Sequence, residues 1–248
     1  MTSSAEPPVN PPSYQLKYVS DDLTYPQLNF SVYIEGPPED QVGFPSWLGR
    51  AGCSRVLDPN VADLVIFSGG SDVYPLLYGE APMEGTYYDK TRDDACVELF
   101  QKCAKDGIPM LGICRGAQFL WVMKGGKLWQ DVNNHNAGEH TVTLLETNQQ
   151  MKASSVHHQA CRFGVSGSRL LMSGGGSTVR KSQDAVQTGP LTDIEGYVFE
   201  KDCILGFQGH PEYSGYPVYS KICLDLIDKY IMMSTRTRVT GGLFRVVD

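Results

Sequence analysis

The chain has 248 residues, of which 41% are hydrophobic and 20% are charged, and this composition excludes a wholly disordered or fibrous protein. Lys and Arg number 21 and Asp and Glu number 28, so the formal net charge is −7, which argues against partners such as nucleic acid or an anionic membrane. No apolar run reaches the ~20 residues of a membrane helix, and no secretory pattern opens the chain. The seven cysteines are scattered and form no Cys-x-x-Cys pair, which predicts reduced thiols and a cytoplasmic location.

Residues 1–28 are rich in Pro and Ser near the start and offer little to bury, so we predict an N-terminal arm there, either loose or held down as an extended segment. Residues 29–248 are predicted to form one α/β domain, with 234–248 left unassigned.

Apolar runs predict strands over 30–34, 64–67, 108–113, 141–145, 197–200 and 204–208. Helical periodicity predicts helices over 42–51, 91–104, 117–123 and 218–232. The alternation predicts a three-layer α/β sandwich with a mostly parallel central sheet. The glycines at 174–176 are interpreted as a flexible turn.

The most informative segment is MLGICRGAQ at 110–118, in which a buried strand leads through Gly-x-Cys-x-Gly into an amphipathic helix. This is the thiol version of the nucleophile elbow, a strand–turn–helix unit that presents a nucleophile above a parallel sheet. Side chains at Gly112 and Gly116 would collide with the neighbouring strand or helix. Cys114 would lie at a helix N-terminus, where the macrodipole favours the thiolate, and the Arg115 N–H would face an oxyanion on the substrate. A buried core cysteine is the structural alternative.

A nucleophile needs a base and a group that orients the base, and the stretch GFQGHPE at 206–212 supplies both at the end of a predicted strand. Residues two apart in an extended segment project to the same side, so Glu212 can fix the imidazole of His210 while the other ring nitrogen faces Cys114. A surface His-Pro turn is the alternative. The remaining cysteines lack the Gly-x-Cys-x-Gly pattern and are interpreted as structural: Cys53, Cys96, Cys103, Cys161, Cys203 and Cys223.

With these residues in place, the chain resembles the class I glutamine amidotransferase superfamily, and within it the γ-glutamyl-peptidase branch that includes γ-glutamyl-γ-aminobutyrate hydrolases. The matching blocks run in family order: SGG at 68–70 with LYGE at 77–80, RD at 92–93, GICRGAQ at 112–118, GGKLWQD at 125–131, SVHHQ at 155–159 and GFQGHPE at 206–212. The resemblance covers about residues 29–230 and implies a flavodoxin-like sandwich in which 29–248 is the glutamine amidotransferase-like domain.

The resemblance also implies roles. Cys114, His210 and Glu212 would form a catalytic triad, and backbone amides at Gly70 and Arg115 would hold the oxyanion. Substrate-binding positions would be Gln118, Ser155, Val156 and His157. Two departures concern the substrate pocket: Gly209 replaces a bulky residue, which is expected to widen the pocket or loosen the loop, and Ser154 stands where Asn is common.

The other histidines and charges are given plainer interpretations. His135 and His140 lie in a polar stretch that we interpret as a surface loop leading into a strand. Together with His157 and His158 they have the composition of a metal site, but no ligand spacing supports one, so no metal is predicted. Arg92 and Asp93 are interpreted as a charge pair at a helix start that holds the nearby loop.

The predicted reaction is hydrolysis of a γ-glutamyl amide, such as glutamine or a γ-glutamyl amine, through a Cys114 thioester, with no cofactor. A second hypothesis is a glutaminase subunit that delivers ammonia to a synthetase or amidoligase on a separate polypeptide. A third, weighted lower, is a non-catalytic binding protein that retains the fold. The expected partner is therefore a small γ-glutamyl molecule, with a homodimer left open.

Overall fold

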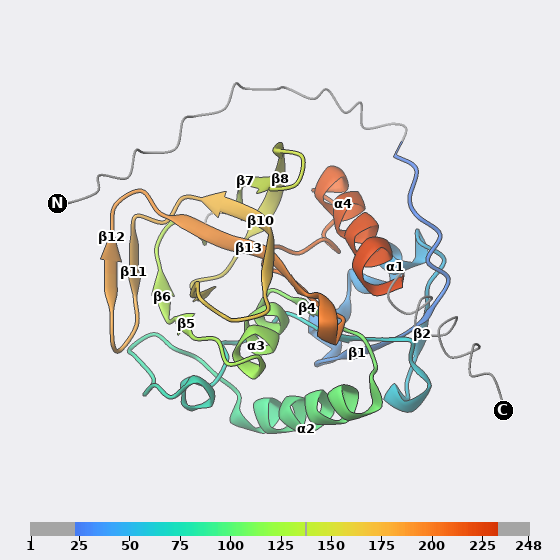
Figure 1. Cartoon of the computed structure of the whole chain (residues 1–248), viewed down its shortest axis with the longest axis horizontal. Coiled ribbons are helices and arrows are strands. Elements are labelled where there is room, and N and C mark those ends of the chain that lie inside the picture. The colour runs from blue at the N-terminus through green and yellow to red at the C-terminus, as the bar shows by residue number, and fades with distance from the viewer. Residues whose placement is uncertain (1–22, 137, 233–248) are drawn as a thin grey trace, which may run out of the picture.

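The computed structural model describes residues 23–136 and 138–232 (Figure 1). Most of the predicted N-terminal arm and all of 234–248 lie outside the described residues. Within the described part, Leu28 is buried and its N–H donates to the carbonyl of Ala51, at 2.8 Å. The end of the predicted arm therefore packs along the domain.

The centre of the fold is a nine-stranded sheet in the order β2-β1-β3-β4-β14-β13-β10-β7-β8. The first five strands are parallel: β2 (Ser54–Val56), β1 (Ser31–Glu35), β3 (Leu64–Phe67), β4 (Met110–Ile113) and β14 (Ile204–Phe207). The last four run antiparallel to their neighbours: β13 (Thr192–Phe199), β10 (Arg169–Gly175), β7 (Gly138–Leu144) and β8 (Gln149–Ser155). The parallel half has the flavodoxin-like strand order 2-1-3-4-5 when its strands are counted along the chain.

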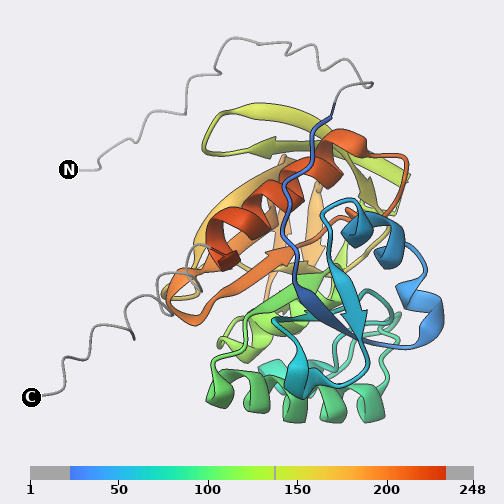
Figure 2. The same ribbon diagram turned by 90° about the vertical axis from the view of Figure 1, so that its right-hand side faces the viewer.

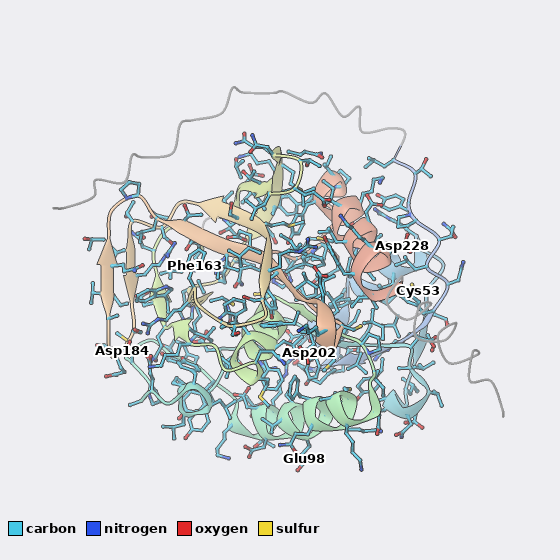
Figure 3. All side chains as sticks on the ribbon, viewed as in Figure 1. Cys53, Glu98, Phe163, Asp184, Asp202 and Asp228 are labelled. Atoms are coloured by element: carbon cyan, nitrogen blue, oxygen red, sulfur yellow. The ribbon has the colours of Figure 1, made fainter. Side chains whose placement is uncertain are left out.

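Helices cover both faces of this sheet (Figure 2). On one face lie α1 (Phe44–Gly49) and α4 (Pro217–Ile227), whose Trp47 and Tyr219 share a core with β1. On the other face lie α2 (Lys90–Asp106) and α3 (Arg115–Met123), whose Cys103 and Phe119 pack with β3. The charged side of α2 faces outward, as Glu98 shows (Figure 3). The predicted three-layer α/β sandwich is confirmed.

Shorter elements complete the described part. One small sheet joins β6 (Asp131–Val132), β11 (Val179–Lys181) and β12 (Val186–Thr188), and another joins β5 (Leu128–Trp129) and β9 (Ala160–Cys161). Short 3₁₀ turns occupy Pro38–Gln41, Pro59–Val61, Pro75–Tyr78 and Glu200–Asp202, and a π turn follows α4 over Asp228–Met232. None of the helices in the described ranges is long and apolar enough to cross a bilayer.

The glycines at 174–176 are not the flexible turn that the sequence predicts, because Gly174 and Gly175 belong to β10. A Cβ atom at Gly174 would lie 2.9 Å from Cγ of Glu195, which projects from the adjacent β13. The strand therefore needs a residue without a side chain at this position.

Candidate active site

Cys114 occupies the turn between β4 and α3, with φ 51° and ψ −110°. A non-glycine residue with positive φ is strained, at a cost on the order of 1–3 kcal/mol, and such strain is characteristic of nucleophile elbows. A Cβ at Gly112 would lie 2.5 Å from the backbone nitrogen of Ala117, and one at Gly116 would overlap the carbonyl oxygen of Phe67 in β3. Both glycines thus permit the tight turn, for the steric reason expected from the sequence.

His210 and Glu212 follow β14, which pairs in parallel with β4, so the carboxyl ends of the two strands bring these residues to the thiol. The Nδ1 atom of His210 lies 2.7 Å from Oε1 of Glu212, and the imidazole is also hydrogen-bonded to Cys114. Burial on its own would lower the pKa of His210, but the negative charge of Cys114, its hydrogen bond and the Glu212 carboxylate together raise that pKa to about 11. The arrangement therefore favours a protonated imidazole beside the sulfur.

Three neighbours hold the imidazole in this orientation. The backbone N–H of His210 donates to Oγ of Ser154 at 2.7 Å. The ring of Tyr213 stacks on the imidazole with centroids 4.4 Å apart and an interplanar angle of 8°. The backbone after the carboxyl end of the parallel strand β3 packs against the ring, since a Cβ at Gly69 would lie 2.8 Å from Cε1 of His210. The sequence places Ser154 only in the substrate pocket and indicates no role for Tyr213.

A series of hydrogen-bonded side-chain amides ends at Sγ of Cys114. Nε2 of Gln118 donates to the carbonyl of Gln159 at 2.8 Å and to Oε1 of Gln208 at 3.1 Å, and Nε2 of Gln208 donates to Sγ of Cys114 at 3.7 Å. The sequence motifs do not single out Gln208, although it stands two residues before His210, the same spacing that pairs His210 with Glu212.

Two hollows meet at Cys114. The larger, about 260 Å³, is lined by Glu39, Asp40, Val42, Gly43, Gly69, Gly70, Cys114, Val156, His210, Glu212 and Tyr213. The smaller, about 130 Å³, is lined by Gly70, Ser71, Asp72, Tyr87, Cys114, Arg115, Gln118, Val156, His157, His158 and Gln159. The thiol thus lies where a substrate could extend in two directions, with Gly70 and Val156 common to both sides.

A buried ionic network supports the floor of the site. Arg115 is 1% exposed, and its guanidinium pairs with Asp93 and lies 3.2 Å from Sγ of Cys96. Arg92 donates to the side chains of Glu35, Asp40 and Ser68 at 3.0–3.2 Å, and a side chain at Gly70 would overlap its guanidinium. The sequence predicts that Arg92 and Asp93 act as one charge pair, but they take different partners: Arg92 holds the loop beside the site through Asp40 and Ser68, and Asp93 holds Arg115.

The four predicted substrate-binding residues fall into two groups. Gln118, Val156 and His157 line the smaller hollow, where burial lowers the pKa of His157 to about 3 and keeps its ring neutral. Ser155 lines neither hollow, and its Oγ donates to the carbonyl of His135 at 3.0 Å.

Two further expectations are wrong in their details. Gly209 does not widen the pocket, because the Tyr219 ring from α4 fills the space, with Oη 2.9 Å from where a Cβ would lie. His135 and His140 are not on a surface loop: His135 is fully buried and His140 is 9% exposed within β7. Both rings contact carboxylates of β13: Nε2 of His135 lies 2.9 Å from Asp193, and Nε2 of His140 lies 3.2 Å from Glu195.

Comparison with known proteins places this geometry in a family. The peptidase C26 family model matches residues 55–212. The chain is 40% identical over 75 residues to the glutamine amidotransferase-like protein YvdE of Lactococcus lactis, covering 29% of this chain and 31% of the relative. It is 26% identical over 144 residues to the carbamoyl phosphate synthase small chain of Buchnera aphidicola, covering 58% of this chain and 34% of the relative. The matches thus span about a third of each of these relatives.

The crystal structure of a GMP synthase subunit protein from Thermoplasma acidophilum has the same fold, with a TM-score of 0.57 and 15% identity over 86% of this chain and 97% of that chain. The family model covers well over half of the chain, including the elbow and the His-x-Glu segment. The chain therefore belongs to the peptidase C26 family, in the class I glutamine amidotransferase-like superfamily.

Proposed function

We propose that this protein hydrolyses γ-glutamyl amide bonds through a γ-glutamyl thioester on Cys114, with His210 and Glu212 completing a catalytic triad. The observation that carries the proposal is the hydrogen-bonded series from Glu212 through His210 to a strained elbow cysteine at which two hollows meet. Membership of a peptidase family supports hydrolysis as the reaction class.

The proposed reaction is acyl transfer in two halves. The Cys114 thiolate attacks the γ-carbonyl while the N–H groups of Gly70 and Arg115 donate to the developing oxyanion, each donor contributing ~3–4 kcal/mol to transition-state stabilisation. The C–N bond breaks as protonated His210 gives its proton to the leaving amine. Water then attacks the thioester and loses a proton to His210, which returns that proton to the departing sulfur so that glutamate is released.

The two hollows suggest where the two parts of a substrate bind. We assign the glutamyl head to the smaller hollow, where Gln118 and His157 offer fixed polar groups, and the leaving amine to the larger one. The larger hollow is bordered by the carboxylates of Glu39 and Asp40, of which Asp40 pairs with Arg92. This charge favours γ-glutamyl amines whose leaving group is neutral or cationic over those that carry a carboxylate.

A glutaminase subunit that passes ammonia to a separate synthetase is the second candidate. The similarity to a carbamoyl phosphate synthase small chain favours it, because that protein is by name one chain of a synthase. In this case glutamine would be the substrate, and turnover by the isolated chain would be slow until the partner binds.

The test is turnover by the purified full chain of glutamine and of a γ-glutamyl amine, compared with Cys114→Ala. Cys53→Ala is the matched control, since Cys53 is a half-buried free thiol that lies outside both hollows. We expect rapid γ-glutamyl amine hydrolysis in the parent and in Cys53→Ala, and none in Cys114→Ala.

Turnover confined to glutamine and stimulated by an added synthetase would favour the glutaminase role. Absence of turnover on every γ-glutamyl compound, with ligand binding retained, would favour the non-catalytic binding protein. Equal turnover in the parent and Cys114→Ala would contradict the thiol mechanism.

A further inference from the structure

A second group of buried polar side chains lies in the antiparallel half of the sheet, apart from the triad. His135 precedes β7, His140 lies in β7, and Glu195 lies in β13 (Figure 1). Each can offer one ligand atom, and these atoms lie within 4.8 Å of one another. The exposed fractions of His135, His140 and Glu195 are 0%, 9% and 1%.

The sheet is built to let these side chains meet. β10 separates β7 from β13, and its Gly174 pairs with Val142 on one side and Asp193 on the other. Because Gly174 has no side chain, Glu195 can occupy the space above β10 and approach His140. A larger residue at position 174 would separate the two groups.

His135 is oriented as a metal ligand would be. Its Nε2 lies 2.9 Å from Oδ2 of Asp193, whose other oxygen pairs with Arg180 at 2.8 Å, so Nε2 carries the hydrogen and donates it to the carboxylate. The lone pair of a neutral His135 ring is then on Nδ1, which lies 3.1 Å from Nδ1 of His140 and 3.1 Å from Oγ of Ser155, whose hydroxyl can donate to this nitrogen or to the His135 carbonyl. A carboxylate that fixes one nitrogen of an imidazole while the other faces a cation is a recurrent feature of metal sites.

The carboxylate of Glu195 is buried, and its one charged neighbour among the described residues is Nε2 of His140, at 3.2 Å, which forms an ion pair when that ring is protonated. Among the described residues, no hydrogen-bond donor reaches either of its oxygens, and the 3.2 Å contact with Nε2 of His140 does not have hydrogen-bond geometry. A buried carboxylate without a hydrogen-bond donor is costly, so a positive charge is expected against it, either a proton on His140 or a bound cation.

We propose that His135, His140 and Glu195 form a binding site for a divalent transition-metal ion, with zinc as the best match. Two imidazoles and a carboxylate are typical zinc ligands, with metal–ligand distances of about 2.0–2.2 Å. Two nitrogens on one tetrahedral ion are then about 3.3 Å apart, close to the 3.1 Å between the two Nδ1 atoms. Glu195 contacts Nε2 of His140, so its carboxylate would rotate toward Nδ1 to complete the site, from within the 4.8 Å that spans the three ligand atoms. The perpendicular rings of His135 and His140, at 88°, suit such an arrangement.

Metal at this site would brace the strand behind the catalytic histidine. Ser155 contacts His135 through Oγ at 3.1 Å from Nδ1, and the preceding residue, Ser154, accepts the backbone hydrogen bond of His210. Both serines lie at the end of β8, which pairs with the β7 segment that carries His140. We infer a structural ion that fixes this strand end, and it takes no part in the chemistry at Cys114.

The test is titration of the metal-free full chain with Zn²⁺ alone by calorimetry and with Co²⁺ alone by absorption spectroscopy. We expect one ion per chain, a Co²⁺ spectrum without the sulfur charge-transfer band that cysteine ligands would give, and a higher unfolding temperature with Zn²⁺. Glu195→Gln and His140→Gln should weaken binding by about 100-fold or more, and Asp193→Asn by about 10- to 100-fold. His158→Gln is the matched control, because it removes another histidine–carboxylate contact, His158–Asp72 at 3.0 Å, outside the cluster.

The control should bind as the parent does. If Glu195→Gln does not fold, His140→Gln with its Zn²⁺-dependent unfolding temperature decides the matter. Absence of stoichiometric binding in the parent would overturn the proposal and leave a proton on His140 as the charge that faces Glu195. Unchanged binding in the variants, or a sulfur charge-transfer band, would also overturn it.

Discussion

Among the buried histidine–carboxylate pairs in the described part of the chain, His210–Glu212 and His140–Glu195 differ in what each histidine faces. His210 and Glu212 share a hydrogen bond of 2.7 Å, and the imidazole reaches a thiol that borders two hollows. His140 approaches Glu195 at 3.2 Å without hydrogen-bond geometry, and its other nitrogen faces the ring of His135. The residue pair alone does not define the role, because in our proposals the Cys114 thiol completes one pair as a nucleophile and a metal ion completes the other.

The difference between the two pairs is tested most strongly by replacing each histidine in turn. His210→Gln should lower kcat/KM for a γ-glutamyl amine by about 10⁴-fold or more, because the thiolate loses its proton partner and the leaving amine its acid. His140→Gln should lower it by less than about 10-fold, since that ring lies behind the site. Steady-state kinetics of both purified variants checks this. Similar losses in the two variants would contradict the separation of roles.

The pKa of His210 tests whether its imidazole is electrostatically coupled to the Cys114 sulfur. The negative charge of Cys114 and its hydrogen bond raise the pKa of His210, so Cys114→Ala should lower that pKa toward the ordinary imidazole value. The measurement is a pH titration of the His210 ring resonances by NMR, with Cys53→Ala as the control that should match the parent. A His210 pKa unaffected by Cys114→Ala would contradict the coupling between imidazole and sulfur.

A smaller effect is expected at Ser154, which acts through the backbone of His210. Ser154→Ala removes the 2.7 Å hydrogen bond, worth about 1 kcal/mol, and should lower kcat about 5-fold with little change in KM. Ser154→Thr, which keeps the hydroxyl, should restore most of kcat. If Ser154→Ala changed KM alone, the residue would belong to substrate recognition, as its sequence position first indicates.

The smallest effect concerns the border of the larger hollow. Glu39→Gln removes one carboxylate, and an exposed charge of this kind contributes about 0.2–1 kcal/mol. The ratio of kcat/KM for a cationic γ-glutamyl amine over one with a carboxylate should therefore fall about 2- to 5-fold, and the difference should shrink in high salt. An unchanged ratio would indicate that the leaving group does not extend along this side.

Parts of the structure that are determined by residues close together in the sequence were predicted well, and parts that depend on distant residues were not. The elbow was predictable because Gly112 and Gly116 act within a few residues of Cys114, and β3 is a fully buried apolar run predicted with the observed bounds. The antiparallel half was predicted poorly. Gly174 in β10 has the appearance of a turn residue, but it leaves room for the side chain of Glu195 on the adjacent β13.

The histidine cluster and the role of Ser154 depend on contacts between distant positions. His140 and Glu195 are 55 residues apart, and His210 is 56 residues from Ser154, so no spacing rule connects them. The choice of Gly at 209 likewise follows from Tyr219 in α4, which fills the space that a side chain would need. Such residues acquire their partners only when the sheet and helices pack.

The central claim is most directly tested by mass spectrometry of the full chain quenched shortly after mixing with a γ-glutamyl amine. We predict a glutamyl adduct on the peptide that contains Cys114, formed in the parent and in Cys53→Ala and absent from Cys114→Ala. An adduct on a different residue, or rapid hydrolysis by Cys114→Ala, would contradict the thioester mechanism.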